Sequence, residues 1–415
     1  MDGLDGRLLE DLRRRAAAYL APWGPSVDFE ELSPARQKAV RKASTELFAL
    51  MARAEAPTAT ASDHVRTPGN VTRSRQHSKG RTYEEDLAEL TPEAEAQVGT
   101  SLDALTALMT LDSVKGFGPA KFRLLHRAGV SPDDALERPE LLDVSGSTAD
   151  ALRRAIRGLT SDDIDLARQR AARQIVMAHR NKARILTYDS PHYPRNLYES
   201  NNPVPVLYAR GNLRILEHRQ AVACVGSRNI DETYGAALQD FVAAACHSRW
   251  VVVSGFATGA DAIGHRTAFE EDGATVCVMP SGLDRPFPPE NRAMWDRLLD
   301  SPHAVMLSEF PFGTSSSALT LQKRNKTIVG CSLGVLVGQS SAKGGAMNAF
   351  RFALEQRKPV ATFEPLPGDD GVNPQAPTSG NAVIAQERKV PVAVFPLRPA
   401  FEEWQRWLTM LSSSI

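Results

Sequence analysis

Two hydrophobic patterns divide this chain of 415 residues. Up to about residue 184, apolar residues recur at spacings of three and four, which is typical of amphipathic helices. Beyond that point, short runs of Val, Leu and Ile alternate with turn residues and helical stretches. Continuous apolar strands that alternate with helices indicate a parallel sheet covered on both faces. The pattern therefore predicts helical domains followed by a doubly wound, Rossmann-like α/β domain.

Composition refines this pattern into five segments. One stretch has almost no large apolar residues and is rich in Thr, Ser, Pro and Gly, so it cannot bury enough surface to fold. We expect a helical module, a flexible linker, a helical domain, a Rossmann-like domain and a C-terminal extension, at residues 1–55, 56–81, 82–184, 185–366 and 367–415. The extension ends in a helix whose Trp404 and Trp407 should pack onto the body of the protein.

The overall charge restricts any nucleic-acid site to a local patch, because 49 Lys and Arg balance 49 Asp and Glu. Basic residues of the linker could touch a nucleic-acid backbone, although a solvated linker is the simpler interpretation. No apolar run approaches the ~20 residues that span a bilayer, and the N-terminus lacks an apolar secretory segment. We therefore expect a cytoplasmic protein without membrane contact.

The four cysteines show no CxxC pairing, and two of them lie inside expected strands. Buried thiols in a reducing compartment are the expected interpretation, rather than disulfides or a metal site.

A possible helix-hairpin-helix lies at residues 111–129. Gly116 and Gly118 separate a short apolar turn from a helix that begins near Pro119. Glycines allow a tight turn whose backbone N–H groups can face a phosphate. Such a hairpin can equally serve as a packing module, and the sequence leaves both uses open.

Four loops of small residues follow expected strands, at residues 226–228, 254–261, 280–284 and 340–345. In a parallel α/β sheet, ligands bind beyond the carboxyl ends of the strands, where helix N-termini offer unpaired N–H groups and a positive dipole end. These loops predict an anion site. None of them matches the G-x-G-x-x-G dinucleotide motif, and no Walker A motif occurs in the chain.

Basic residues lie close to these loops. Lys323, Arg324, Asn325 and Lys326 form a run that we expect to lead into a helix beginning at Thr327. A charge run is usually a solvated face, but this one neighbours the anion-seeking loops, which favours phosphate contact. The predicted phosphate-binding residues are Gly226, Ser227, Arg228, Ser254, Gly255, Lys323, Arg324, Asn325, Lys326, Lys343 and Gly344.

Evidence for catalysis is thin. His265 follows Asp261 by one helical turn, and Glu309 ends an expected strand, so an acid–base pair or metal ligands are conceivable. A structural network that fixes loop geometry is the better interpretation, and Asn291 and Arg292 are expected to belong to it. We predict no catalytic residues, no metal and no cofactor.

From about Tyr193 to Glu364 the chain resembles the DNA-processing protein A family (DprA, also called Smf). The matching phrases include YPRNL, VGSRNIDETYG, VVVSGFATGADAIGHRTAF, LSEFPFG and RNKTIVGCSLGVLVG. The resemblance implies a Rossmann-like domain that binds single-stranded DNA during recombination and natural transformation, a homodimer, and a RecA-type recombinase as partner. It also implies a phosphate pocket formed by Arg228, Arg324, Asn325 and Lys326 and lined by Ser254 and Gly255.

The chain departs from the family pattern in several places. LTLQK stands where the family usually has Phe-Pro, and GGAMNA replaces its G-S-L-x-T-A phrase. Lys343-Gly344-Gly345 instead resembles the P-G-G-x-G-T-x-x-E motif of nucleotide phosphoribohydrolases, but Arg351 occupies the position of the catalytic glutamate. A Rossmann-like sensor of a nucleotide-derived signal also remains open, because it needs only the pocket.

Overall fold

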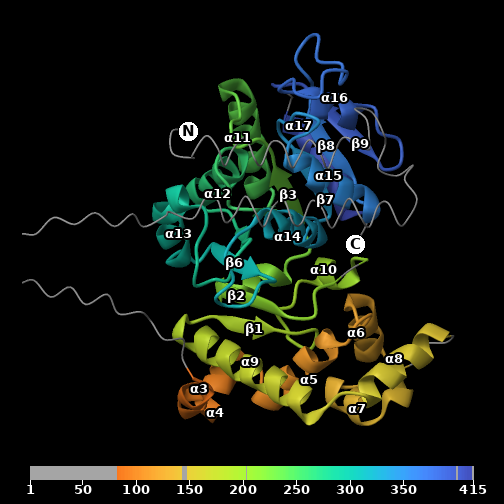
Figure 1. The fold of residues 1–415 in the computed structure, drawn as a ribbon. Helices are drawn as coiled ribbons and strands as arrows, with labels where there is room; N and C mark the ends of the chain where they lie inside the picture. The colour runs from red at the N-terminus through yellow and green to blue at the C-terminus, as the bar shows by residue number, and fades with distance from the viewer. Residues whose placement is uncertain (1–81, 143–146, 202, 399–400, 414–415) are drawn as a thin grey trace, which may run out of the picture. The chain divides into compact units, whose positions relative to one another are not determined.

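The computed structural model describes residues 82–142, 147–201, 203–398 and 401–413. In this part of the chain, a nine-stranded sheet carries helices on both faces, and a group of helices lies against its β1 edge (Figure 1). The sheet confirms the doubly wound, Rossmann-like class. The helices and linker expected within residues 1–81 lie outside the described residues.

The N-terminal described part is helical. It builds its own apolar core from residues such as Leu111, Phe117, Phe122 and Leu152, and its longest helix also packs onto the sheet. Its helices are α3 (Tyr83–Glu89), α4 (Pro92–Val98), α5 (Leu102–Ser113), α6 (Pro119–Arg127), α7 (Pro132–Glu137), the 3-10 helix η2 (Pro139–Leu141), α8 (Ser147–Arg157) and α9 (Ser161–Arg180).

The expected hairpin is present between α5 and α6. Gly116 adopts a positive φ of 91° in the turn, and Gly118 caps α6, which begins at Pro119. Its second helix packs against the sheet domain: the Arg123 guanidinium donates to the carbonyls of Tyr198 and Ser200, and His126 Nδ1 lies 2.8 Å from Tyr198 Oη. This face of the hairpin therefore serves in packing.

The strands run in the order β1-β2-β6-β5-β4-β3-β7-β8-β9. They are β1 (Arg184–Leu186), β2 (Leu207–Gly211), β3 (Ala221–Val225), β4 (Val251–Ser254), β5 (Thr275–Val278), β6 (Ala304–Ser308), β7 (Gly334–Val337), β8 (Val360–Phe363) and β9 (Val392–Phe395). The pairs from β6 to β9 are parallel, as predicted. The β1–β2 and β2–β6 pairs are antiparallel, so the mostly parallel sheet is mixed at this edge, which the sequence pattern did not predict.

Alternate residues of the parallel strands pack against helices on opposite faces. In β3, Ala223 belongs to the core beneath α14 and α15, whereas Cys224 belongs to the core beneath α11, α12 and α17.

The remaining helices are α10 (Arg195–Glu199), η3 (Leu213–Glu217), α11 (Glu232–His247), α12 (Ala260–Glu270), η4 (Pro289–Asn291), α13 (Arg292–Leu299), α14 (Ala318–Gly330), α15 (Ala346–Glu355), α16 (Ser379–Ala385) and α17 (Phe401–Ser412).

The C-terminal extension completes the sheet. Its strand β9 pairs with β8. The expected final helix is α17, whose Trp404 and Trp407 rings lie 5.7 and 6.0 Å from the Phe241 ring of α11. This confirms the predicted packing of the two tryptophans. The short helix α16, within a Pro- and Gly-rich stretch, was not predicted. Among the described residues, no helix is both long and apolar enough to cross a membrane.

The connections reverse direction at β3. From β3 the chain proceeds through β4, β5 and β6 on one side, and through β7, β8 and β9 on the other. In doubly wound sheets, ligands bind beyond the carboxyl ends of the strands at such a switch point. The fold therefore places the loops after β3 and β7 side by side at the expected ligand crevice.

Candidate phosphate-binding site

A cavity of about 470 Å³ opens at the switch point. Its walls come from the loops after β3, β4 and β7 and from α14 and α15. It is lined by Val225, Gly226, Ser227, Arg228, Ala257, Asp261, Ala318, Leu321, Gln322, Arg324, Asn325, Ser340, Ser341, Gly344, Gly345, Ala346 and Asn348. Six of the predicted residues, Gly226, Ser227, Arg228, Arg324, Asn325 and Gly344, are thus brought together.

The loop after β3 is fixed by close backbone packing. Ser227 N–H donates to the carbonyl of Gln339 in the loop after β7 at 2.8 Å, and the Ser227 carbonyl accepts from Ala260 N–H at 3.0 Å. A Cβ on Gly259 would lie 2.4 Å from the carbonyl oxygens of Ser227 and Arg228, so only glycine fits there. The three loops therefore form one rigid unit, from which the exposed Arg228 projects.

Arg324 contributes a buried positive charge to the cavity wall. Its guanidinium fits into a notch left by Gly255, because a Cβ on Gly255 would lie 1.1 Å from Arg324 Nη1. Nη1 lies 3.6 Å from Asp261 Oδ2 and donates to the Val278 carbonyl at 3.4 Å, while the buried Nε has no hydrogen-bond partner. Because Arg324 belongs to the cavity lining, its guanidinium places a positive charge in the wall, which favours an anion in the cavity.

Burial and charge act in opposite directions on this pair. Burial raises the pKa of Asp261 and lowers the pKa of Arg324, while the ion pair opposes both shifts. Ala257 N–H also donates to Asp261 Oδ2 at 3.2 Å, which supports the carboxylate. Because arginine is not deprotonated in proteins, Arg324 keeps its charge.

The notch lies in a constrained loop. Phe256, which follows Gly255, adopts a positive φ of 62° and is fully buried. Its carbonyl accepts a hydrogen bond of 2.8 Å from Asn291 Nδ2, so Asn291 belongs to the structural framework, as expected. Backbone outliers of this kind often lie at ligand sites, and here the outlier holds Gly255 against Arg324.

The basic run lies inside a helix and not before it. The helix α14 begins at Ala318, where the Ser317 side chain caps its N-terminus, so the expected start at Thr327 was wrong. Ala318, Leu321, Gln322 and Asn325 recur at helical spacing and face the cavity. The helix therefore separates the run into residues that line the cavity and residues that do not.

Lys323 and Lys326 are outside the cavity lining. Burial raises the pKa of the Glu309 carboxyl, and the charges of the two lysines partly oppose this shift. Glu309 also accepts a hydrogen bond from Thr327 Oγ1 at 3.1 Å. Lys326 Nζ also lies 5.8 Å from the centre of the Phe352 ring. The two lysines are thus placed near Glu309 and Phe352, on a different side of α14 from Gln322 and Asn325.

Three other predicted residues also lie outside the lining. Ser254 is fully buried and donates its hydroxyl to the Cys224 carbonyl at 2.5 Å, so it supports the sheet. Gly255 acts indirectly, through the notch for Arg324. Lys343 is exposed on the loop between β7 and α15. The third expected loop, after β5, contributes no lining residue.

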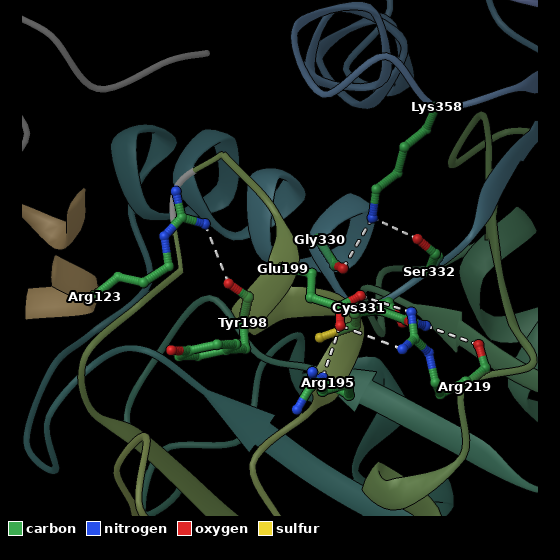
Figure 2. A network of polar contacts seen from close by, with 10 residues as sticks. Arg123, Arg195, Tyr198, Glu199, Arg219, Gly330, Cys331, Ser332 and Lys358 are labelled. Atoms are coloured by element: carbon green, nitrogen blue, oxygen red, sulfur yellow. Dashed lines mark hydrogen bonds and ion pairs between the residues drawn. The ribbon is translucent and has the colours of Figure 1, made fainter. Parts of the chain in front are cut away.

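The far end of α14 is anchored by a half-buried lysine. Lys358 points its ammonium group at the C-terminus of the helix, where it donates to the carbonyls of Gly330 and Ser332 (Figure 2). It also donates to the Val329 carbonyl. The Asn196 side chain donates to the Cys331 carbonyl at 3.2 Å. These contacts satisfy the free carbonyls of the last turn and fix the helix that carries Arg324.

His265 makes a structural contact with strand β5. His265 is fully buried, its Nδ1 lies 2.8 Å from Thr275 Oγ1, and burial lowers its pKa to about 3. Within the described residues, no group of three or more His, Cys, Asp or Glu side chains could hold a metal ion. All four cysteines are free and buried, as predicted.

Several lining residues were missed by the sequence analysis. Ser340, Ser341 and Asn348 line the cavity, and Gln339 connects two loops through its carbonyl and its side chain, which pairs with Asp231. The strand–loop–helix pattern around Gly344 predicted a ligand-binding loop here, but it did not show which side chains of the loop face the cavity.

Comparison with known proteins identifies the family of this domain. Residues 184–390 match the family described as DNA recombination-mediator protein A. Through this domain, the chain belongs to the DprA/Smf family.

Individual members of the DprA/Smf family are moderately similar to it. The Smf protein of Synechocystis sp. is 32% identical over 201 residues, which are 47% of this chain and 49% of that protein. The DNA processing protein DprA of Bacillus subtilis is 29% identical over 201 residues, 47% of this chain and 67% of that protein. The chain thus spans about half to two thirds of these relatives. The structure of DprA from Streptococcus pneumoniae aligns with a TM-score of 0.49 and 19% identity, covering 68% of this chain and 98% of that one.

Proposed function

We propose that the cavity binds the phosphate backbone of single-stranded DNA and that the protein does so without catalysing a reaction. The main observation in support is the position of Arg324. Its guanidinium is buried in the cavity wall, and its Nε has no hydrogen-bond partner. The exposed Arg228 lies in the same lining and adds a second cation. Both side chains bind phosphate without reading a base, which suits binding independent of sequence.

The depth of the site supports a single strand over a duplex. Arg324 is only 5% exposed, so a phosphate must enter the cavity to reach it. A single strand is flexible and can bend a phosphate into a recess. Duplex DNA, with a persistence length of about 150 base pairs, presents its phosphates on a stiff convex surface.

The family membership supports a role in DNA recombination, DNA uptake or a related defence process. In this role the protein would hold a strand for a RecA-type recombinase, act as a homodimer and work in the cytoplasm. Family membership and the resemblance support these assignments, and the geometry of the cavity supports the proposed phosphate site.

The decisive test is the salt dependence of oligonucleotide binding. Arg228→Gln should weaken the binding of a thymidine oligonucleotide about tenfold, because it removes a charged phosphate contact. It should also make the slope of log K against log salt shallower by about 0.7. Arg138→Gln, which removes an exposed arginine from the helical part, is the matched control and should bind like the wild type. Equal affinity and slope for Arg228→Gln would contradict the pocket assignment.

A nucleotide-sensing role is the second candidate, because 470 Å³ is within the usual size of small-ligand pockets. Tight binding of a nucleoside monophosphate, together with no binding of any single strand at low salt, would favour it. Release of free base would indicate the phosphoribohydrolase alternative. Asp261 is the carboxylate among the described lining residues, and its pairing with Arg324 argues against that chemistry.

A further inference from the structure

The loop after β7 is held from behind by a segment that lies about forty residues further along the chain, at the start of α16. Asn381 Oδ1 accepts a hydrogen bond from Ser340 N–H at 2.9 Å, and Ser379 Oγ accepts one from Ala342 N–H at 2.9 Å. Gly380 N–H donates to the Ser340 carbonyl, also at 2.9 Å. Three consecutive residues thus bind the backbone of a loop that lines the cavity.

The contact is tightly packed. Ser379 and Asn381 are completely buried, and a Cβ on Gly380 would lie 2.6 Å from the Ser340 carbonyl oxygen and 2.9 Å from Met347 Sδ. Only glycine therefore allows this close approach.

Asn381 also ties the loop to the sheet. Its Nδ2 donates to the carbonyl of Gly338, just after β7, at 2.9 Å and to that of Phe363, at the end of β8, at 3.2 Å. With its Oδ1 bound to Ser340, the amide uses three of its four hydrogen-bonding positions, which fixes its orientation.

We propose that Ser379, Gly380 and Asn381 are positioning residues of the phosphate site. They line no part of the cavity themselves, but they hold the loop 340–345 and the start of α15 in the conformation that receives the phosphate. A loop that is ordered before binding loses less conformational freedom when the ligand arrives, so affinity rises without a new contact. The identity of the ligand as DNA rests on the proposed function, whereas the contacts that hold the loop do not depend on it.

Ser379→Ala tests the proposal with a small change, and Asn381→Ala is the stronger second variant. Each should weaken single-strand binding, Ser379→Ala by about tenfold, since it leaves a loop N–H without its acceptor. The slope of log K against log salt should stay that of the wild type because no cation is removed, unlike in Arg228→Gln. Thr110→Val is the matched control: this threonine is equally buried and hydrogen bonded, but it lies in α5 of the helical part, away from the cavity.

Amide hydrogen exchange of the full chain without DNA provides the second measurement. Exchange in residues 340–345 should be faster in Ser379→Ala than in the wild type and in Thr110→Val. Wild-type affinity in both Ser379→Ala and Asn381→Ala, or unchanged exchange in this loop, would overturn the proposal. A shallower salt slope would also overturn it, since the variants would then be acting through Arg228 or Arg324. If the wild type binds no single strand, the proposed function fails, and the exchange result alone decides whether the segment holds the loop.

Discussion

Gly255 decides where the buried positive charge of the cavity lies. Gly255→Ala would place a methyl group 1.1 Å from the present position of Arg324 Nη1, so the guanidinium must leave its notch and Asp261 loses its partner. An unpaired buried charge should lower the free energy of unfolding by roughly 3–5 kcal/mol. Urea unfolding and oligonucleotide binding measure both effects, and binding should fall at least about tenfold.

The control for this change is Gly118→Ala, because a Cβ on Gly118 meets no atom within 4 Å and its φ of −98° suits any residue. This variant should keep wild-type affinity. If Gly255→Ala bound DNA as well as Gly118→Ala, Arg324 would not be a phosphate ligand.

His265 makes stability depend on pH. Thr275 Oγ1 donates to the Val252 carbonyl, so His265 Nδ1–H donates to Thr275 and the buried Nε2 carries no proton. The pKa is about 3 in the folded protein and about 6.5 when unfolded. Between these values the unfolded chain binds a proton that the folded one does not, so stability is full above pH 6.5 and falls as the pH decreases.

His265→Asn, whose amide can replace the Nδ1–H contact, should remove this dependence. Between pH 6 and pH 4, the unfolding free energy of the wild type should fall more steeply than that of the variant, by about 1.4 kcal/mol per pH unit. Urea titrations at several pH values measure both curves. Parallel curves for the two proteins would show that His265 is not the buried neutral group described here.

Among the elements, those with a strong local pattern were predictable. The apolar runs from β3 to β8 are buried on both faces, so each reads as a continuous hydrophobic segment whatever its neighbours. The direction of β1 and β2 could not be predicted, because their short apolar runs are compatible with either pairing. The helix α16 was missed because its Ser-Gly-Asn start resembles a turn, although these residues instead bind the loop after β7.

The basic run on α14 shows why the site was predicted only in part. The sequence pattern treated the run as one patch, whereas helical spacing places Arg324 and Asn325 at the cavity and the two lysines outside its lining. Burial of Arg324 depends on the notch at Gly255, nearly seventy residues earlier in the chain. Such a contact between distant residues leaves no trace in local periodicity.

On the scale of the whole molecule, a net charge of zero means that the proposed DNA affinity must come from local cations. Among the described lining residues these are Arg228 and Arg324. If the cavity alone holds the strand, a short oligonucleotide should bind with a slope of log K against log salt of about −0.7 to −1.4, which corresponds to one or two neutralised phosphates.

A clearly steeper slope would implicate cations outside the cavity, and the linker expected at residues 56–81 contains Arg73 and Arg75. Replacing both arginines by Gln should then make the slope of log K against log salt shallower by about 0.7 for each phosphate contact that is lost. Arg228→Gln would remove only the one contact made by Arg228. If the cavity is sufficient, the linker variant should match the wild type at every salt concentration. Because the salt slope counts neutralised phosphates, this pair of titrations separates a site built only by the sheet and its loops from one extended by the linker.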